Sequence, residues 1–152
     1  MPFPTDWEVH PGKGAGELRF GDTFEDVVRL LGLPDQPPAK LWNSNTVRAG
    51  WQGGGLVIHF NPTVTFIEFS RGAGLVARLL GADVFRTPAG EVVQALVDAG
   101  HAFDDSDPEV GYLFVFKDIQ VGLWRQVVPR DEKDALGSYF DTVGAGRVGY
   151  YG

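Results

Sequence analysis

Residues 20–34 constrain the fold of this chain more than any other stretch, because they have the pattern of one complete amphipathic helix. Apolar residues recur there at positions i, i+3, i+4 and i+7, the spacing that aligns side chains on one face of an α-helix. They are Phe24, Val27, Val28 and Leu31. A stripe of this kind must be buried, so the helix requires a second layer to pack against.

The residues at both ends of this stretch also favour a helix. Asp22 or Thr23 is placed to cap the first turn. An acid three residues further on, Glu25 or Asp26, completes a capping box. Gly32 tolerates the left-handed conformation that follows a last turn, and the next proline prevents further helix. We therefore expect the helix to end before Gly32.

The composition predicts one folded domain. The chain has 152 residues, of which 43% are hydrophobic and 12% aromatic, enough apolar side chains for a substantial core over residues 1–152. No apolar run reaches the roughly 20 residues that cross a bilayer. The absence of cysteine excludes disulfides, thiolate catalysis and cysteine-ligated metal sites. We expect no cofactor.

The net charge bears on the kind of partner this chain can bind. The formal charge is −7 at pH 7, whereas binding to nucleic acids and anionic membranes depends mainly on Lys and Arg. Both classes of partner are therefore disfavoured, and a basic protein fits better. The first seven residues, Met-Pro-Phe-Pro-Thr-Asp-Trp, lack the basic and apolar segments of a secretory signal, which favours a cytoplasmic location.

Much of the remaining sequence favours short β-strands. The clearest are Leu56–Phe60 and Val64–Ser70, which are rich in β-branched and aromatic residues and are separated by an Asn-Pro-Thr turn. Residues 75–85 fit either a third strand or a helical turn. Prolines and glycines predict irregular structure at residues 1–17 and a connector at residues 35–40. Further strands are expected at residues 18–20, 40–48, 112–116, 119–128 and 147–151.

A second helix is expected after Thr87 and Pro88, a capping residue followed by a proline at the first helical position. Its apolar stripe is Ala89, Val92, Val93 and Leu96. These elements together predict an α+β fold in which an antiparallel sheet has helices packed on one face. The two stripes keep a constant offset and both helices precede glycine-led strands, which indicates a tandem duplication with repeats at 18–85 and 86–152.

The first helix also carries the motif of a known structural group. Gly21-Asp22-Thr23, Val27 and Leu31-Gly32-Leu33-Pro34 resemble a Gly-x-Thr, Val, Leu-Gly-x-Pro signature. That signature occurs in the small outer-membrane assembly lipoproteins and in the wider group with the β-lactamase-inhibitor-protein-like fold. The resemblance implies helices on one face of an antiparallel sheet, sometimes in tandem, and a protein-binding role. The lipobox cysteine is missing, which argues against an outer-membrane function.

The glycine-rich segment at residues 11–21 is similar to small uncharacterised bacterial proteins and to toxin-immunity proteins. This resemblance also implies a binding module, in which the sheet presents its open face to another protein. We therefore expect a non-enzymatic protein-binding module of the immunity or inhibitor type.

The tryptophans and the acidic residues supply the predicted partner-binding set. Trp42 and Trp51 fall in a linker with polar neighbours, where burial in the core is least assured. Exposed aromatic side chains beside adaptable polar groups are typical of protein-binding surfaces. With acidic residues for a basic partner, the set is Trp42, Trp51, Asp104, Asp105 and Asp107. The alternative is that all the tryptophans belong to the core.

The alternative function is a small-ligand-binding protein or enzyme that uses His59 and Glu68. Alternation along strand Leu56–Phe60 turns His59 away from the three large apolar residues of that strand. Glu68 shares this face if Ile67 and Phe69 point into the core. The pair could then line a cavity and exchange protons with a ligand. A cross-strand polar pair on a solvated sheet is the purely structural reading.

Two other motifs are better explained as turns than as binding sites. Residues 104–109 offer oxygen ligands for calcium but lack the glycine and the bidentate glutamate of an EF-hand loop. Residues 12–16, Gly-Lys-Gly-Ala-Gly, look like a phosphate loop, but no Ser or Thr follows the lysine. We therefore assign no metal ligand and no nucleotide site.

Overall fold

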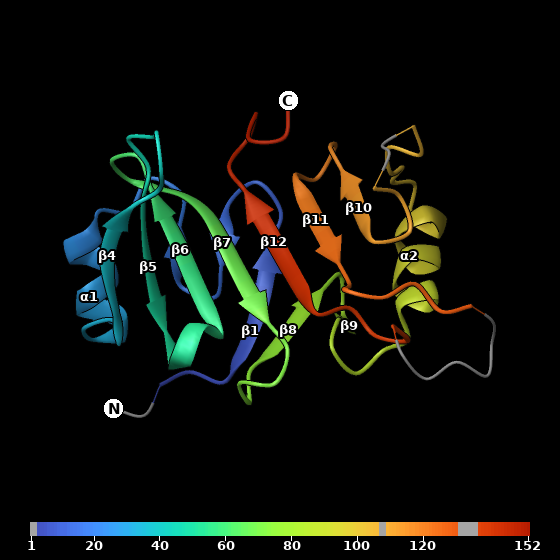
Figure 1. Cartoon of the computed structure of the whole chain (residues 1–152), viewed down its shortest axis with the longest axis horizontal. Helices are drawn as coiled ribbons and strands as arrows, with labels where there is room; N and C mark the ends of the chain where they lie inside the picture. The colour runs from blue at the N-terminus through green and yellow to red at the C-terminus, as the bar shows by residue number, and fades with distance from the viewer. Residues whose placement is uncertain (1–2, 107–108, 131–136) are drawn as a thin grey trace.

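The computed structural model describes residues 3–106, 109–130 and 137–152. It is a mixed helix and sheet structure in which strands dominate (Figure 1). The described residues form two helices, α1 (Phe24–Leu31) and α2 (Ala89–Asp98), and a 3-10 turn, η1 (Gln52–Gly54). One sheet, here called the large sheet, contains β4 (Gln36–Lys40), β5 (Val47–Trp51), β6 (Leu56–Phe60), β7 (Val64–Ser70), β10 (Leu113–Phe116), β11 (Val121–Trp124) and β12 (Thr142–Gly146).

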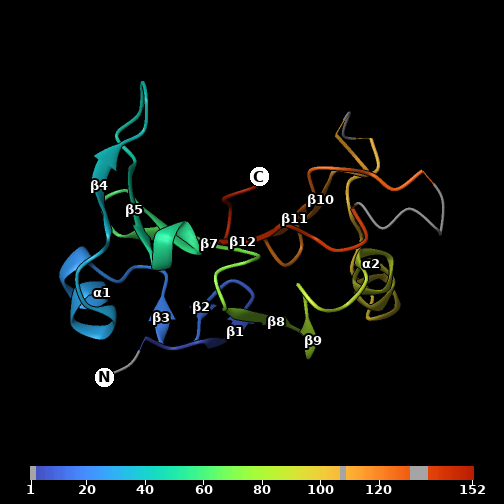
Figure 2. The ribbon, with the colours of Figure 1, turned by 60° about the horizontal axis from the view of Figure 1, so that its bottom comes forward.

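The second sheet, here called the small sheet, contains β1 (Asp6–His10), β2 (Gly14–Ala15), β3 (Leu18–Arg19), β8 (Val76–Leu79) and β9 (Ala82–Asp83). Its strands β1 and β8 are parallel and its other pairs are antiparallel. In Figure 2, α1 and α2 lie near the two ends of the large sheet, and the small sheet lies between them on the same side. The small sheet was not predicted, and it occupies the space where the sequence suggested helices alone.

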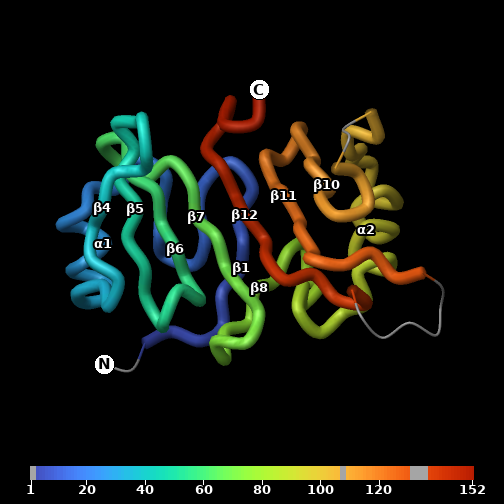
Figure 3. Tube along the Cα trace, viewed as in Figure 1, coloured from blue at the N-terminus to red at the C-terminus, as the bar shows by residue number. Residues whose placement is uncertain are grey.

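The order of strands in the large sheet follows the chain in two runs, which can be traced in Figure 3. After α1, the chain passes inward from the edge through β4, β5, β6 and β7. After α2, it passes inward from the other edge through β10, β11 and β12. The two runs meet where β12 pairs antiparallel with β7, from Thr142 opposite Ser70 to Gly146 opposite Phe66.

The first helix has the ends that the sequence predicted. The Thr23 hydroxyl accepts a hydrogen bond from the Asp26 amide at 3.1 Å, and the Asp26 carboxylate accepts one from the Thr23 amide at 3.0 Å. Gly32 follows the last turn with φ 83°. Val27 is fully buried, and Leu30 packs against the core where the prediction had Val28. The predicted stripe is therefore correct in position but rotated by part of a turn.

The second helix begins at Ala89 as expected, but its cap differs from the prediction. Pro88 is at the capping position and provides no side-chain hydrogen bond, so Thr87 does not cap the helix. Ala89, Val92 and Leu96 are buried. Among the described residues, neither helix has both the length and the apolar character needed to cross a membrane.

Several strand predictions at the beginning of the chain are wrong. Residues 35–40, predicted as a connector, contain the edge strand β4, and the single strand expected at 40–48 is a loop leading into β5. Pro37 and Pro38 are compatible with β4 because an edge strand leaves half of its backbone N–H groups unpaired. Residues 1–17 were expected to be irregular, but they include β1 and β2.

The end of the chain also departs from the prediction. The last strand is β12, and residues 147–151, predicted as a strand, form turns instead. β12 has the sequence Thr-Val-Gly-Ala-Gly, which has few β-branched or aromatic residues. Gly144 and Gly146 are required because aromatic side chains come close to their Cα atoms, the Phe66 ring at Gly144 and the Tyr150 ring at Gly146.

Candidate functional site

The face of the large sheet that carries His59, Phe66 and Glu68, opposite the core residues Ile58 and Ile67, is here called the open face. Along β6, Leu56, Ile58 and Phe60 are in the core, while His59 points to the open face. Along β7, Ile67 and Phe69 are in the core, and Phe66 and Glu68 point the other way. The side-chain alternation that placed His59 and Glu68 on one face thus describes the observed arrangement.

His59 and Glu68 share this face without forming a bonded pair. The register places His59 opposite Phe66 and Glu68 opposite Val57, so the two side chains are diagonal neighbours. The His59 ring packs against the Phe66 ring, with centroids 5.1 Å apart. Within the described part of the chain, no hydrogen bond joins the imidazole to the Glu68 carboxylate. Direct proton exchange between these two groups has no geometric support.

A pocket of about 350 Å³ opens on this face where β7, β12 and β11 lie side by side. Its lining includes the Glu68 carboxylate and three aromatic side chains, Phe66, Trp124 and Tyr151. Gly122 of β11 and Gly144 of β12 also line it. These glycines are direct neighbours across the sheet, in register with Glu68. Because neither has a side chain, the pocket extends to the backbone.

The residues after β12 form the cover of this pocket. The chain turns back over the open face, and the Tyr150 ring stacks on the Phe66 ring with centroids 4.7 Å apart and an interplanar angle of 15°. The Tyr151 amide donates a hydrogen bond of 2.6 Å to the side-chain oxygen of Gln120, which is itself buried. A Cβ atom at Gly122 would lie 2.6 Å from the Tyr151 hydroxyl, so the observed position of the tyrosine requires a glycine at position 122.

Burial controls the charges around the pocket. It raises the pKa of Glu68 above its usual value, and the positive charge of Arg48 partly offsets this. Burial lowers the pKa of His59, and Arg48 lowers it further. The pKa values of Tyr150 and Tyr151 are raised, first by burial and then by nearby groups that include Glu68. His59 and both tyrosines are therefore neutral at pH 7.

The described residues supply no direct hydrogen-bonding partner for the Glu68 carboxylate. None of the side chains or backbone groups in the described ranges donates a hydrogen bond to it. Arg48 is exposed and acts on Glu68 through its charge. A carboxylate with reduced hydration and free acceptor positions, next to aromatic rings, is suited to binding a ligand that carries hydrogen-bond donors.

Of the two tryptophans predicted to bind a partner, only Trp42 is exposed. Its side chain is 93% exposed in the loop between β4 and β5. Trp51 is 2% exposed, and its indole N–H donates a 3.0 Å hydrogen bond to the Gly32 carbonyl. The predicted role of Trp51 in a binding surface is therefore wrong. Alternation along β5 turns Ala49 and Trp51 into the core together.

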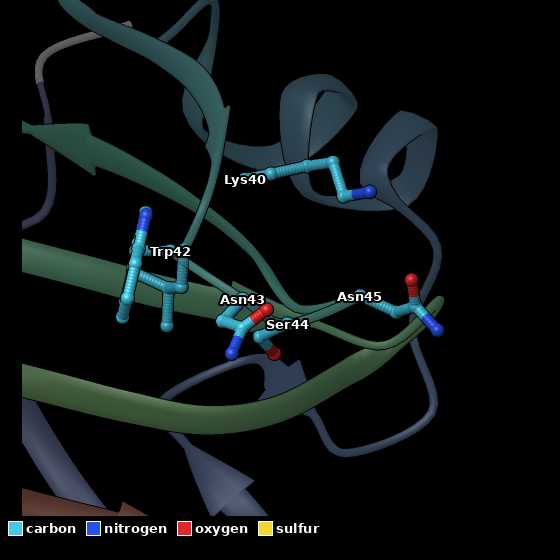
Figure 4. Close-up of a pocket in the computed structure, with 6 residues that line it drawn as sticks. Lys40, Trp42, Asn43, Ser44 and Asn45 are labelled. Atoms are coloured by element: carbon cyan, nitrogen blue, oxygen red, sulfur yellow. The ribbon is translucent and has the colours of Figure 1, made fainter.

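The loop around Trp42 has a shallow hollow that lacks the character of a ligand site. It is lined by six consecutive residues, Lys40 at the end of β4 and the loop residues from Leu41 to Asn45. Figure 4 shows the Lys40 and Trp42 side chains pointing away from each other. Trp42 is among the exposed large hydrophobic residues, so the loop offers a protruding side chain for contact with a partner.

Asp104 and Asp105 lie in the segment between α2 and β10, at the other end of the large sheet from the β4–β5 hairpin that carries Trp42 (Figure 1). Asp104 accepts hydrogen bonds from the Ser106 hydroxyl at 2.6 Å and the Ser106 amide at 3.1 Å, and these lower its pKa. Asp105 is exposed, and Asp107 lies outside the described residues. Asp104 and Asp105 thus do not form one patch with Trp42. Among the described residues, no cluster of His, Asp or Glu side chains could hold a metal ion.

Most of the pocket was not predicted from the sequence. Glu68 was recognised from alternation, whereas Phe66, Trp124 and Tyr151 were not connected with it. One signal was available: Gly122, Gly144 and Gly146 are placed so that they share a face of neighbouring strands. Glycines inside strands often mark a close approach by another group. No family model matches the chain, and no curated protein or solved structure was found to be similar to it.

Proposed function

We propose that this protein is a non-enzymatic binding module that holds a partner protein on the open side of the large sheet, with Trp42 as an anchor. The observation that carries the proposal is the 93% exposure of Trp42. In Figure 2 the β4–β5 hairpin rises from the sheet on the side opposite the helices. A tryptophan at such a tip has a large apolar surface in water, and tryptophan is enriched among residues that dominate binding energies.

The charge of the chain favours a basic partner, as expected for an immunity-type or inhibitor-type protein. The net charge of −7 attracts a basic protein over a distance and speeds its association. Asp105, exposed at the far end of the same sheet, is a candidate for a peripheral contact. We place the protein in the cytoplasm on the sequence argument given above.

We also propose that the two helix-and-strand runs arose by duplication, within a fold related to the β-lactamase-inhibitor-protein-like group. Support comes from the chain order, because each helix precedes strands that pass from an edge of the large sheet to its centre. The runs differ in length, with β4 to β7 in the first and β10 to β12 in the second.

The proposal is tested by placing a photo-crosslinking amino acid at position 42 and identifying the captured protein by mass spectrometry. The affinity of that protein is then measured for the wild type and for Trp42→Ala. We expect the variant to bind at least about tenfold more weakly, as for a residue that anchors an interface. Its stability should stay within about 0.5 kcal/mol of the wild type, because the side chain is exposed.

Leu33→Ala is the matched control, because Leu33 is also an exposed apolar residue, at 80%. It follows α1, outside the hairpin. We expect this variant to keep the wild-type affinity within about twofold, as for most exposed positions outside an anchor. Equal binding by Trp42→Ala and the wild type would contradict the proposal.

A second candidate function, binding of a small ligand, is favoured by the pocket beside Glu68. The aromatic walls and the unpaired carboxylate support it, whereas the separation of His59 from Glu68 gives no support to catalysis by that pair. The chemistry of the pocket can be tested without knowing the protein partner.

A further inference from the structure

We propose that the pocket beside Glu68 binds an organic cation, and that its preferred cation is a guanidinium group. This site is separate from the Trp42 hairpin, so the inference holds whether or not a protein binds there. The site consists of the Glu68 carboxylate, three aromatic walls and two glycines of the sheet.

The carboxylate requires a ligand with donors. Glu68 is half-buried, and across the described ranges it accepts no hydrogen bond. Burial disfavours its charged form, as the direction of its pKa shift indicates. A cationic donor restores the hydrogen bonds and the charge balance that burial removes, and such charge-assisted bonds are stronger than neutral ones. A guanidinium can donate two parallel N–H groups to one carboxylate.

The walls select a flat and weakly hydrated cation. Phe66, Trp124 and Tyr151 line the pocket together with Glu68. The faces of aromatic rings attract cations, and a guanidinium also stacks on them as a plane. An ammonium group is compact and strongly hydrated, so it loses more water on entry and cannot stack. The combination of rings and carboxylate therefore favours guanidinium over ammonium.

The space in the pocket suits a group of this size. Its volume is about 350 Å³, within the range of ligand-binding pockets. Gly122 and Gly144 form part of the pocket wall beside Glu68, and the Tyr151 hydroxyl and the Phe66 ring pack close to these glycines, so a planar group is bounded by the strands and by these rings. Trp124 is 37% exposed, which leaves this wall accessible from solvent.

The surrounding charges do not prevent entry of a cation. The titratable or charged groups around Glu68 are Arg48 from β5, His59 from β6, and Tyr150 and Tyr151 from the C-terminal residues. Arg48 is the only one of these that is positively charged at pH 7, and it is exposed and outside the pocket lining. The net charge of −7 also raises the local concentration of cations over that of neutral ligands.

The inference is tested with three amidated probes: N-acetylarginine, N-acetylcitrulline and N-acetyllysine. Citrulline is the matched neutral control, because it replaces the guanidinium with a urea of nearly the same shape. Binding is followed by NMR through the Trp124 indole N–H and the Gly122 and Gly144 amides. We expect saturable shifts with the arginine probe, at least about tenfold weaker binding of citrulline, and intermediate binding of lysine.

Glu68→Gln is the decisive variant, because it removes the charge and keeps the shape of the side chain. It should bind the arginine probe at least about tenfold more weakly. Asp105→Asn removes an equal charge from an exposed position elsewhere and should stay within about twofold. Unchanged amide signals from α1 and α2 would show that both variants are folded. Equal affinity for arginine and citrulline, undiminished binding by Glu68→Gln, or no saturable shift at Trp124 would overturn the proposal.

The guanidinium can come from a free small molecule or from an arginine side chain of a polypeptide. A Gly-Gly-Arg-Gly-Gly peptide compared with the arginine probe separates these sources. Tighter binding of the peptide identifies a polypeptide ligand, and equal or weaker binding identifies a small molecule. Trp42→Ala should bind the arginine probe like the wild type, so the cation site and the proposed protein interface can fail independently.

Discussion

The two halves of the large sheet, β4–β7 and β10–β12, carry similar apolar side chains on the core side and different residues on the open side. Toward the core, β6 and β7 contribute Ile58 and Ile67, and β11 and β12 contribute Leu123 and Val143. On the open side, β6 and β7 carry His59, Phe66 and Glu68, whereas the inner positions of β11 and β12 are Gly122, Gly144 and Gly146.

This difference explains why the pocket lies where the halves meet. The first half contributes the carboxylate and the Phe66 ring, and the second half contributes the Trp124 ring and the two glycines, Gly122 and Gly144. The C-terminal tyrosines pack against both halves, with Tyr150 on Phe66 and Tyr151 beside Gly122. If larger residues replaced Gly122 and Gly144, their side chains would fill the pocket. The two glycines are therefore as important for the pocket as the side chains that line it.

The largest loss of stability is expected when a side chain is added at a glycine of β12. In Gly144→Ala, the new Cβ would clash with the Phe66 ring, and we expect a loss of about 2–3 kcal/mol in the free energy of unfolding. Gly90→Ala is the matched control, because Gly90 lies in α2 with open space around it, and this change should stabilise the protein by about 0.5–1 kcal/mol. Urea denaturation measures the free energy of unfolding of both variants. A Gly144→Ala variant as stable as the wild type would mean that packing on the open face does not require a glycine at this position.

A smaller loss of stability is expected when the Tyr151 ring, which packs against Gly122, is removed. Tyr151→Ala deletes a largely buried ring and should lower the free energy of unfolding by about 2 kcal/mol, less than for a fully buried aromatic residue. Tyr151→Phe should be close to neutral, because the hydroxyl makes no hydrogen bond among the described residues. Urea denaturation of the two variants separates the ring from its hydroxyl, and equal losses would contradict this description of the cover.

The energetic cost of burying the Glu68 carboxylate can be tested through the pH dependence of stability. Its pKa in the folded protein is raised above the usual 4.5, so between these two values the folded state holds a proton that the unfolded state has released. The ionised Glu68 is therefore unfavourable, and wild-type stability falls as pH rises through this window. Glu68→Gln should raise the melting temperature at pH 7, and this advantage should vanish below about pH 4.5. A lower melting temperature at pH 7 would mean that a group absent from this description stabilises the carboxylate.

The smallest effect concerns His59, whose pKa in the folded protein is lowered below 6.5. Above pH 6.5 it is neutral in both states and contributes nothing to the pH dependence. As pH falls below 6.5, the unfolded state is protonated first, so stability is lost until the pH reaches the lower folded-state value. His59→Gln should flatten the stability profile in this window, as measured by urea denaturation at several pH values. An unchanged slope would show that the buried ring does not titrate as described.

The parts of the fold that the sequence predicted are those specified by local pattern. The stripe and caps of α1 depend on neighbours within one or two turns. The β-branched and aromatic residues of β6 and β7 predict these strands in the same local way. The alternation along these strands also placed His59 and Glu68 on one side. In each case the information lies within a few residues of the element that it specifies.

The parts that were not predicted depend on contacts between distant residues. β12 contains two glycines that weaken any strand signal, and the reason for them is the ring positions of Phe66 and Tyr150. Trp42 and Trp51 lie only nine positions apart in the sequence, but only Trp51 follows an alternation that turns it into the core. The pocket combines residues of β7, β11 and β12 with the C-terminal turn, and no local pattern links these segments.

The four tryptophan indole N–H signals in one NMR spectrum test the central claim, that the open side of the large sheet is the binding side. Trp42 and Trp124 are exposed on that side or at its edge, whereas Trp7 and Trp51 are buried and donate to the carbonyls of Pro4 and Gly32. Addition of the partner captured through position 42 should shift the Trp42 and Trp124 signals and leave those of Trp7 and Trp51 in place. Binding that leaves Trp42 and Trp124 unchanged would contradict the account.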